Sequence, residues 1–141
     1  IEALTLGIEI VEAPAPKSSD VMIAAQKLIG DVDAIYCPTD NTILTALESV
    51  VKVGIDGRLP VFSADTGSVE RGAVAALGFN YGDIGRQTGE VVVRILKGEA
   101  AGEIPVRVAN GSELYVNPKM ASRMGVEIPA SVLARATKVV E

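Results

Sequence analysis

The sequence predicts an α/β fold, a doubly wound and mostly parallel sheet flanked by helices. The main observation is that short runs rich in Val and Ile alternate with stretches whose apolar residues recur at helical spacing. A second is that 48% of the residues are hydrophobic but only 4% aromatic, which is typical of parallel strands covered by helices. A chain of 141 residues is long enough for one domain with a real core.

Four apolar runs in the first part of the chain are predicted as strands, over residues 4–11, 33–37, 59–63 and 73–79. Helical spacing predicts a helix over residues 21–29, closed by Gly30, and another from Ile43 to the turn at residues 56–58. A short helix is expected over residues 69–71. The clearest amphipathic stripe is that of residues 84–96, and Gly98 is a good residue to end that helix.

The last third of the chain contains less regular patterns. Residues 104–108 and 113–116 are predicted to be extended, with a turn at Asn110-Gly111 between them. Asn117-Pro118 is typical of a helix start, and Gly125 of its end. A final helix is predicted after Pro129, because apolar residues from 132 to 140 fall on one side of it.

Composition excludes several classes of function. The formal net charge is -5 without a run of Lys or Arg, which disfavours binding to nucleic acid or to an anionic membrane. The absence of histidine removes Ser-His-Asp and Cys-His catalysis and most zinc sites, and no cofactor fingerprint is present. The single cysteine, Cys37, lies in an apolar strand and is expected to be a buried, inert thiol. We therefore expect no enzyme, no metal and no cofactor.

Polar side chains follow three of the predicted strands. They are Thr39, Asp40 and Asn41 after the second strand, Asp65 and Thr66 after the third, and Asn80 and Tyr81 after the fourth. Parallel strands end at one edge of a sheet, where ligands bind in open α/β folds. The plain alternative is that these residues only form turns and cap helices. The sequence leaves both interpretations open.

Asp65 is the strongest candidate for a ligand-binding residue, since a carboxylate can pair with the ammonium or hydroxyl group of a ligand. Tyr81 is placed to stack on a ring, whereas Phe79 lies within the strand pattern and is expected in the core. Asp40 and Asp65 together suggest paired acid–base chemistry, but no nucleophile or metal-binding set accompanies them.

Several segments together resemble a known family. They include the run from Val32 to Thr42, the run from Pro60 to Thr66, Ala75 to Tyr81, Asp83 to Gly89, Leu96 to Glu99, Leu114 to Lys119 and Met124 to Pro129. Their order is similar to that in the type I periplasmic binding proteins of ABC importers. The likeness is greatest to a branch whose members include binders of aromatic amino acids.

The resemblance implies a fold of two α/β lobes joined by hinge strands, with a small ligand closed between them. Residues 1–141 correspond to the C-terminal ligand-binding lobe, so we expect the chain to be a piece of a longer one. In such folds the helix over 82–98 packs on the other lobe. Thr39, Asp40 and Asn41 match a polar turn of the lobe, Asp65 an aspartate that meets the ligand, and Asn80-Tyr81 the last hinge crossing.

The resulting hypothesis is a substrate-binding component of an ABC import system, with an amino acid as ligand and a membrane permease as partner. The location implied is periplasmic, or extracellular with a lipid anchor. Without the other lobe, the helix from Ile84 to Leu96 is expected to mediate self-association or domain swapping. The alternative function is the effector domain of a lactose-repressor-type regulator. A third, an enzyme or phosphoacceptor receiver, lacks the acidic cluster and lysine that it needs.

Overall fold

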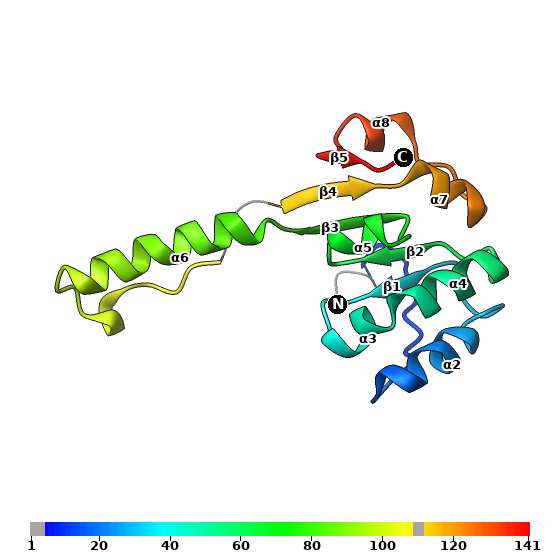
Figure 1. Cartoon of the computed structure of the whole chain (residues 1–141), viewed down its shortest axis with the longest axis horizontal. Coiled ribbons are helices and arrows are strands. Elements are labelled where there is room, and N and C mark those ends of the chain that lie inside the picture. The colour runs from blue at the N-terminus through cyan, green and yellow to red at the C-terminus, as the bar shows by residue number, and fades with distance from the viewer. Residues whose placement is uncertain (1–4, 109–111) are drawn as a thin grey trace.

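The computed structural model describes residues 5–108 and 112–141, in which five strands form one sheet (Figure 1). The strands are β1 (Ile35–Cys37), β2 (Val61–Ser63), β3 (Ala75–Phe79), β4 (Ser112–Val116) and β5 (Lys138–Val139), in the spatial order β1-β2-β3-β4-β5. β1, β2 and β3 are parallel, β4 is antiparallel to β3, and β5 is parallel to β4. The predicted α/β class with a mostly parallel sheet is confirmed.

Helices connect the strands and supply the apolar faces that cover the sheet. They are η1 (Ser18–Asp20), α2 (Val21–Gln26), α3 (Asn41–Thr45), α4 (Leu47–Gly57), α5 (Gly67–Glu70), α6 (Tyr81–Leu96), η2 (Ala101–Glu103), α7 (Pro118–Arg123) and α8 (Ala130–Leu133). The second helix predicted from the sequence is divided at Ala46 into α3 and α4. α4 ends at Arg58, which adopts the left-handed conformation that often follows a helix.

The core lies between the sheet and α2, α4 and α7. Leu47 of α4, Val61 of β2 and Met124 after α7 are fully buried in it. Gly54 shows how closely α4 packs here, since an added Cβ would lie 2.7 Å from Cγ2 of Val61. Burial of these side chains, at roughly 25 cal/mol per Å² of apolar surface, is the main stabilising contribution.

The two faces of the sheet differ in how well they are covered. Ile35 and Cys37 of β1 are buried, whereas Tyr36 between them points to the other face and is 65% exposed. Leu77 of β3 lies on the same face of the sheet as Tyr36, because the strand register aligns Tyr36 with Ala75, two residues before Leu77. Leu77 is 60% exposed. α4 and α5 lie together in front of the sheet in Figure 1. The face that carries Tyr36 therefore remains largely open.

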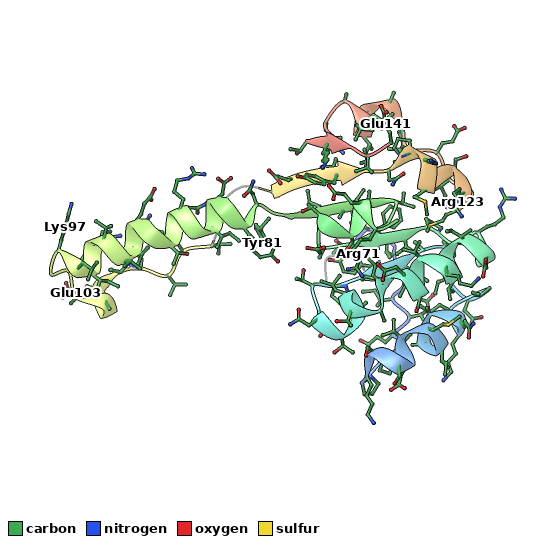
Figure 2. All side chains as sticks on the ribbon, in the orientation of Figure 1. Arg71, Tyr81, Lys97, Glu103, Arg123 and Glu141 are labelled. Atoms are coloured by element: carbon green, nitrogen blue, oxygen red, sulfur yellow. The ribbon has the colours of Figure 1, made fainter. Side chains whose placement is uncertain are left out.

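α6 extends away from the sheet as an arm, and the chain returns along it (Figure 1). None of its residues is buried, and Val92, Ile95 and Leu96 are exposed although they belong to its apolar stripe. Figure 2 shows Tyr81 where the arm leaves the sheet, and Lys97 and Glu103 at its far end. The helix predicted over 84–96 is thus confirmed, and it starts three residues earlier.

Two sequence predictions are wrong in the described part of the chain. Residues 5–11 form no strand, because no neighbouring chain pairs with them. Residues 105–108 belong to no strand of the sheet, Ile104 has the extended backbone predicted for this segment, and the turn predicted at Asn110-Gly111 lies outside the described residues. The final helix stops at Leu133: the N–H of Thr137 donates to Leu114 and that of Val140 to Val116, so residues after 136 join the sheet instead.

Candidate functional site

The strand register brings the first two polar turns together at one edge of the sheet. Cys37 pairs with Ser63, so the turns that follow β1 and β2 are neighbours. β3 continues past them: a Cβ on Gly78 would lie only 2.7 Å from the carbonyl oxygen of Ala64 and 3.2 Å from the main-chain N of Thr66. The third predicted cluster, Asn80 and Tyr81, begins after β3 ends, at the start of α6.

Asp40 caps α3. Its Oδ1 accepts hydrogen bonds from the N–H groups of Thr42 (2.8 Å) and Ile43 (3.1 Å). Capping of this kind contributes roughly 1 kcal/mol. Its Oδ2 makes no hydrogen bond within the described residues, and the neighbouring Thr39 and Asn41 are exposed. Asp40 is therefore a capping residue that retains one carboxylate oxygen for another partner.

Asp65 is held in a small network of buried hydroxyl groups. Its Oδ2 accepts from the N–H and the Oγ of Ser68 (3.0 and 3.1 Å), and its own N–H donates to Oγ of Ser63 (3.1 Å). Ser63 and Ser68 are buried and bonded to each other at 3.1 Å. Oδ1 of Asp65 has no hydrogen-bond partner in the part of the chain that the structure describes. The network fixes the direction in which this oxygen points.

Among the described residues, no cationic side chain forms an ion pair with the Asp65 carboxylate. The nearby Arg71 donates from Nε and Nη2 to both carboxylate oxygens of Glu48, each at 2.8 Å. This hydrogen bonding, with a smaller contribution from the charge of Asp65, raises the pKa of Arg71. Because Arg71 is already paired with Glu48, the charge of Asp65 remains available to a cationic group of a ligand.

Asn80 forms the joint between the sheet and α6. Its Oδ1 accepts from the N–H groups of Gly82 (2.9 Å) and Asp83 (3.2 Å), and its Nδ2 donates to Oε1 of Glu113 (3.0 Å). Oδ1 thus accepts two hydrogen bonds and Nδ2 donates one, so only one amide hydrogen of the side chain is left without a partner in these bonds. Tyr81 beside it is 66% exposed. Asn80 is thus a structural residue here, and Tyr81 is the accessible one of the pair.

The interpretation as turn and capping residues therefore holds for Asp40 and Asn80, which cap α3 and α6, and for Asp65, which holds the turn before α5. Asp40 and Asp65 each keep a free oxygen at the sheet edge. Sequence reasoning misplaced Phe79, which is 48% exposed rather than in the core. The reason is that β3 runs beyond β2, so the end of the strand lacks a neighbour on that side. Phe79 and Tyr81 thus present exposed aromatic surface at the end of β3 and the start of α6.

Metal binding and membrane spanning receive no support from the described residues. Over residues 5–108 and 112–141, no three acidic or cysteine side chains gather in a group that could hold a metal ion. Within the same ranges, no helix is both long and apolar enough to cross a membrane. Burial raises the pKa of the Cys37 thiol to about 11, so this group is protonated at neutral pH, and the predicted burial of Cys37 is confirmed.

Comparison with known proteins gives consistent matches along the chain. Residues 2–140 match the family model for ABC transporter substrate binding proteins. The chain is 36% identical over 109 residues to a tyrosine-binding protein of Clostridioides difficile, an alignment that covers 77% of this chain and 32% of that one. The chain thus spans about a third of the curated relative.

Solved structures agree with the family match. A conserved domain protein from Vibrio cholerae is 45% identical with a TM-score of 0.88, over 98% of this chain and 47% of that one. An ABC domain from Streptococcus pneumoniae, solved in complex with L-Trp, is 30% identical with a TM-score of 0.84, over 98% and 48% of the two chains. A ligand-free, open substrate binding protein from Clostridium difficile is 32% identical with a TM-score of 0.75, over 99% and 46%.

The family expected from the sequence motifs is therefore confirmed, and the fold matches one half of each solved relative. The chain belongs to the ABC transporter substrate binding protein family.

Proposed function

We propose that this chain forms one wall of a cleft that binds an amino acid, an aromatic one, for an ABC-type import system. The observation that carries the proposal is that two relatives of at least 30% identity are a tyrosine-binding protein and a domain solved with L-Trp. The chain spans about half of the solved relatives, so the second wall of the cleft belongs to the other half of the family's fold.

The geometry of the sheet edge supports this ligand class. An amino acid presents an ammonium group, a carboxylate and a side chain. Oδ1 of Asp65 and Oδ2 of Asp40 are acceptors suited to the ammonium group, while Tyr81 offers an aromatic face to a ring. Thr39, Asn41 and Thr66 would supply neutral hydrogen bonds at the same turns, and Asn80 would hold the hinge. No group at this edge supplies the nucleophile or the metal of an enzyme, so we assign binding and not catalysis.

The mechanism proposed is closure of two lobes on the ligand, followed by recognition of the closed form by a membrane permease. α6 would pack its apolar stripe against the other lobe, because Val92, Ile95 and Leu96 are exposed in this chain. In the 141-residue chain alone, the same stripe is expected to drive self-association, which light scattering over a range of concentrations tests. A protein of this kind works outside the cytoplasmic membrane, in the periplasm or as a lipid-anchored extracellular protein.

The function is tested by isothermal titration of the full-length protein that carries this sequence against the twenty amino acids. We expect binding of L-Tyr, L-Trp or L-Phe. The variant Asp65→Asn removes the charge, yet its amide oxygen can still accept from Ser68 and preserve the turn. It should weaken binding at least about tenfold, because a charge-assisted hydrogen bond contributes roughly 1.5–3 kcal/mol.

The matched control is Asp33→Asn, the same change at an exposed residue before β1, at the opposite end of the strand. This control should bind like the unmodified protein. Equal binding by Asp65→Asn and Asp33→Asn would move the site away from Asp65 but keep the function. The absence of measurable binding to any of the twenty amino acids would contradict the proposed ligand class. The regulator alternative is not favoured, since the matches are to transporter substrate-binding proteins.

A further inference from the structure

Two buried serines close a ring of hydrogen bonds with Asp65, at the turn between β2 and α5. The main-chain N–H of Asp65 donates to Oγ of Ser63, Oγ of Ser63 bonds to Oγ of Ser68, and Oγ of Ser68 bonds to Oδ2 of Asp65, each at 3.1 Å. Ser63 and Ser68 are 3% and 0% exposed, so water does not compete for these bonds. We call this arrangement the serine ring.

Only one direction of donation is possible around the serine ring. A main-chain N–H can only donate, so Oγ of Ser63 accepts from Asp65. An ionised carboxylate can only accept, so the single hydrogen of the Ser68 hydroxyl goes to Oδ2. The hydrogen between the two hydroxyl groups must therefore come from Ser63. Every hydrogen of the serine ring is thus committed, and the ring requires an acceptor at the position of Oδ2.

A second donor makes the same demand on Oδ2. The main-chain N–H of Ser68 also donates to this oxygen, at 3.0 Å. The turn itself has little freedom to move, because β3 passes so closely that a Cβ on Gly78 would lie 2.7 Å from the carbonyl oxygen of Ala64. Two donors therefore hold Oδ2 on the inner side of the turn. Oδ1 has no hydrogen-bond partner among the described residues, so it is the oxygen left for a ligand.

We propose that Ser63 and Ser68 are positioning residues that make this turn select a hydrogen-bond donor in the ligand. The proposal rests on the proposed function, and it specifies which group of the amino acid this wall of the cleft recognises. Because the serine ring occupies Oδ2, Asp65 presents one acceptor, which pairs with an ammonium group and repels a carbonyl or carboxylate oxygen. A ligand with an acceptor in place of its ammonium group is therefore rejected.

The serine ring also predicts what an amide does in place of the carboxylate. A side-chain amide has one oxygen, which accepts, and one NH2 group, which only donates. In Asp65→Asn the two donors of Ser68 hold the amide oxygen at the position of Oδ2, so the NH2 group takes the place of Oδ1. The variant then presents a donor to the ligand. It should lose the amino acid and accept the corresponding 2-oxo acid, which has a carbonyl oxygen where the amino acid has its ammonium group.

The alternative is that the two serines only stabilise the start of α5. In that case their hydroxyl groups affect the free energy of unfolding, and Ser68→Ala weakens every ligand of the cleft to the same extent. A positioning role through Asp65 predicts a different result. Ser68→Ala then weakens only those ligands that carry a donor for Oδ1, because it removes one of the two hydrogen bonds that hold Oδ2 in place.

The orientation of the side chain is tested first, without a ligand, by NMR spectroscopy of the full-length protein that carries this sequence. In Asp65→Asn we expect the side-chain NH2 protons to exchange with water as quickly as those of the exposed Asn41. Protection of these protons by about tenfold or more relative to Asn41 would place the NH2 group inside the serine ring and overturn the proposal.

Isothermal titration of the same protein then compares L-tryptophan, indole-3-pyruvate and indole-3-propionate, with the tyrosine and phenylalanine series beside them. The unmodified protein should bind the amino acid at least about tenfold more tightly than the 2-oxo acid, and Asp65→Asn should abolish or reverse this preference. Ser68→Ala should weaken binding of the amino acid at least about threefold but leave that of the propionate unchanged, since the propionate has no ammonium group. Ser122→Ala, the same change at an exposed residue of α7, is the matched control and should bind all three probes like the unmodified protein.

Circular dichroism establishes that each variant folds before binding is measured, and if Ser68→Ala does not fold, the two Asp65→Asn measurements decide the proposal. It is also overturned if Asp65→Asn keeps the preference of the unmodified protein, or if Ser68→Ala weakens the propionate as much as the amino acid. Absence of binding to all three aromatic amino acids would contradict the proposed function, whereas the exchange of the amide protons decides the orientation without any ligand.

Discussion

Gly78→Ala is the perturbation that most directly tests how the sheet supports the acidic turn. Gly78 lies in β3, where the strand passes the turn that carries Asp65. A methyl group on it would lie 2.7 Å from the carbonyl oxygen of Ala64, and 3.2 Å from both N and Cγ2 of Thr66. Two of these three neighbours are main-chain atoms, so a side-chain rotation cannot relieve the contact.

The magnitude follows from two opposing contributions. Replacing glycine by alanine in a strand restricts the unfolded chain and stabilises the protein by roughly 0.5–1 kcal/mol. Overpacking against fixed neighbours costs roughly 1–3 kcal/mol. The larger contribution is the second, so the free energy of unfolding should fall by about 1–2 kcal/mol. For a domain of this size, that corresponds to a decrease in Tm of roughly 3–8 °C.

Urea unfolding followed by circular dichroism measures the effect as a shift in midpoint at constant slope. Gly85→Ala is the matched control, because a Cβ at Gly85 meets no atom within 4 Å. Alanine is also the better helix former by about 1 kcal/mol, so the control should be neutral or slightly stabilising. If Gly78→Ala unfolds at the same urea concentration as the unmodified chain, then the turn is not fixed against β3, and the reasoning is refuted.

Three further predictions follow from buried or paired groups. Burial raises the pKa of the Cys37 thiol from 9.0 to about 11. The contribution of this thiol to the free energy of unfolding should therefore be complete below pH 9 and fall by on the order of 3 kcal/mol as pH rises to 11. Urea unfolding of Cys37→Ala should not show this fall with pH. Asn117→Ala should lower the free energy of unfolding, measured by thermal unfolding, by about 2–3 kcal/mol. The reason is that this buried residue caps α7 by accepting from the N–H of Met120 and also donates to the carbonyl of Val69. A decrease of under about 0.5 kcal/mol would contradict this prediction. The Arg71 hydrogen bond lowers the pKa of Glu48, so Glu48→Gln should destabilise by under about 1 kcal/mol at pH 7, an effect that is lost as pH falls through the lowered pKa of Glu48; a difference that persists in strong acid would contradict the ion-pair explanation.

Part of the candidate site could be predicted from the sequence because it depends on local chemistry. The sequence offers Thr39 and Asp40 as caps of the following helix, and Asp40 fills that role through main-chain groups only two and three residues away. The role of Asp65 in the turn before α5 is also local, since its carboxylate accepts from Ser68 only three residues later. Which oxygen of each carboxylate stays free depends on how these caps orient the side chains, and the sequence does not encode that directly.

The failed predictions concern segments whose structure depends on a distant partner. Residues 5–11 have the β-branched composition of a strand, but a strand requires a paired neighbour, and a cavity of about 1040 Å³ separates them from β1. Residues near Val139 have helical spacing, yet β4 offers an unpaired edge that binds them as β5. In both segments the pattern is compatible with two structures, and pairing across the sheet selects one.

The sequence by itself determined the alternation of strands and helices, the position of α6 and the polar turns at the strand ends, because these depend on periodicity and on residues within one turn of each other. The tertiary structure alone decided which faces are covered: Tyr36, Leu77 and the stripe of α6 are apolar, yet they are exposed. The physical reason is that apolar periodicity specifies that a face must be buried but not what buries it, and burial requires a partner of matching shape at that place.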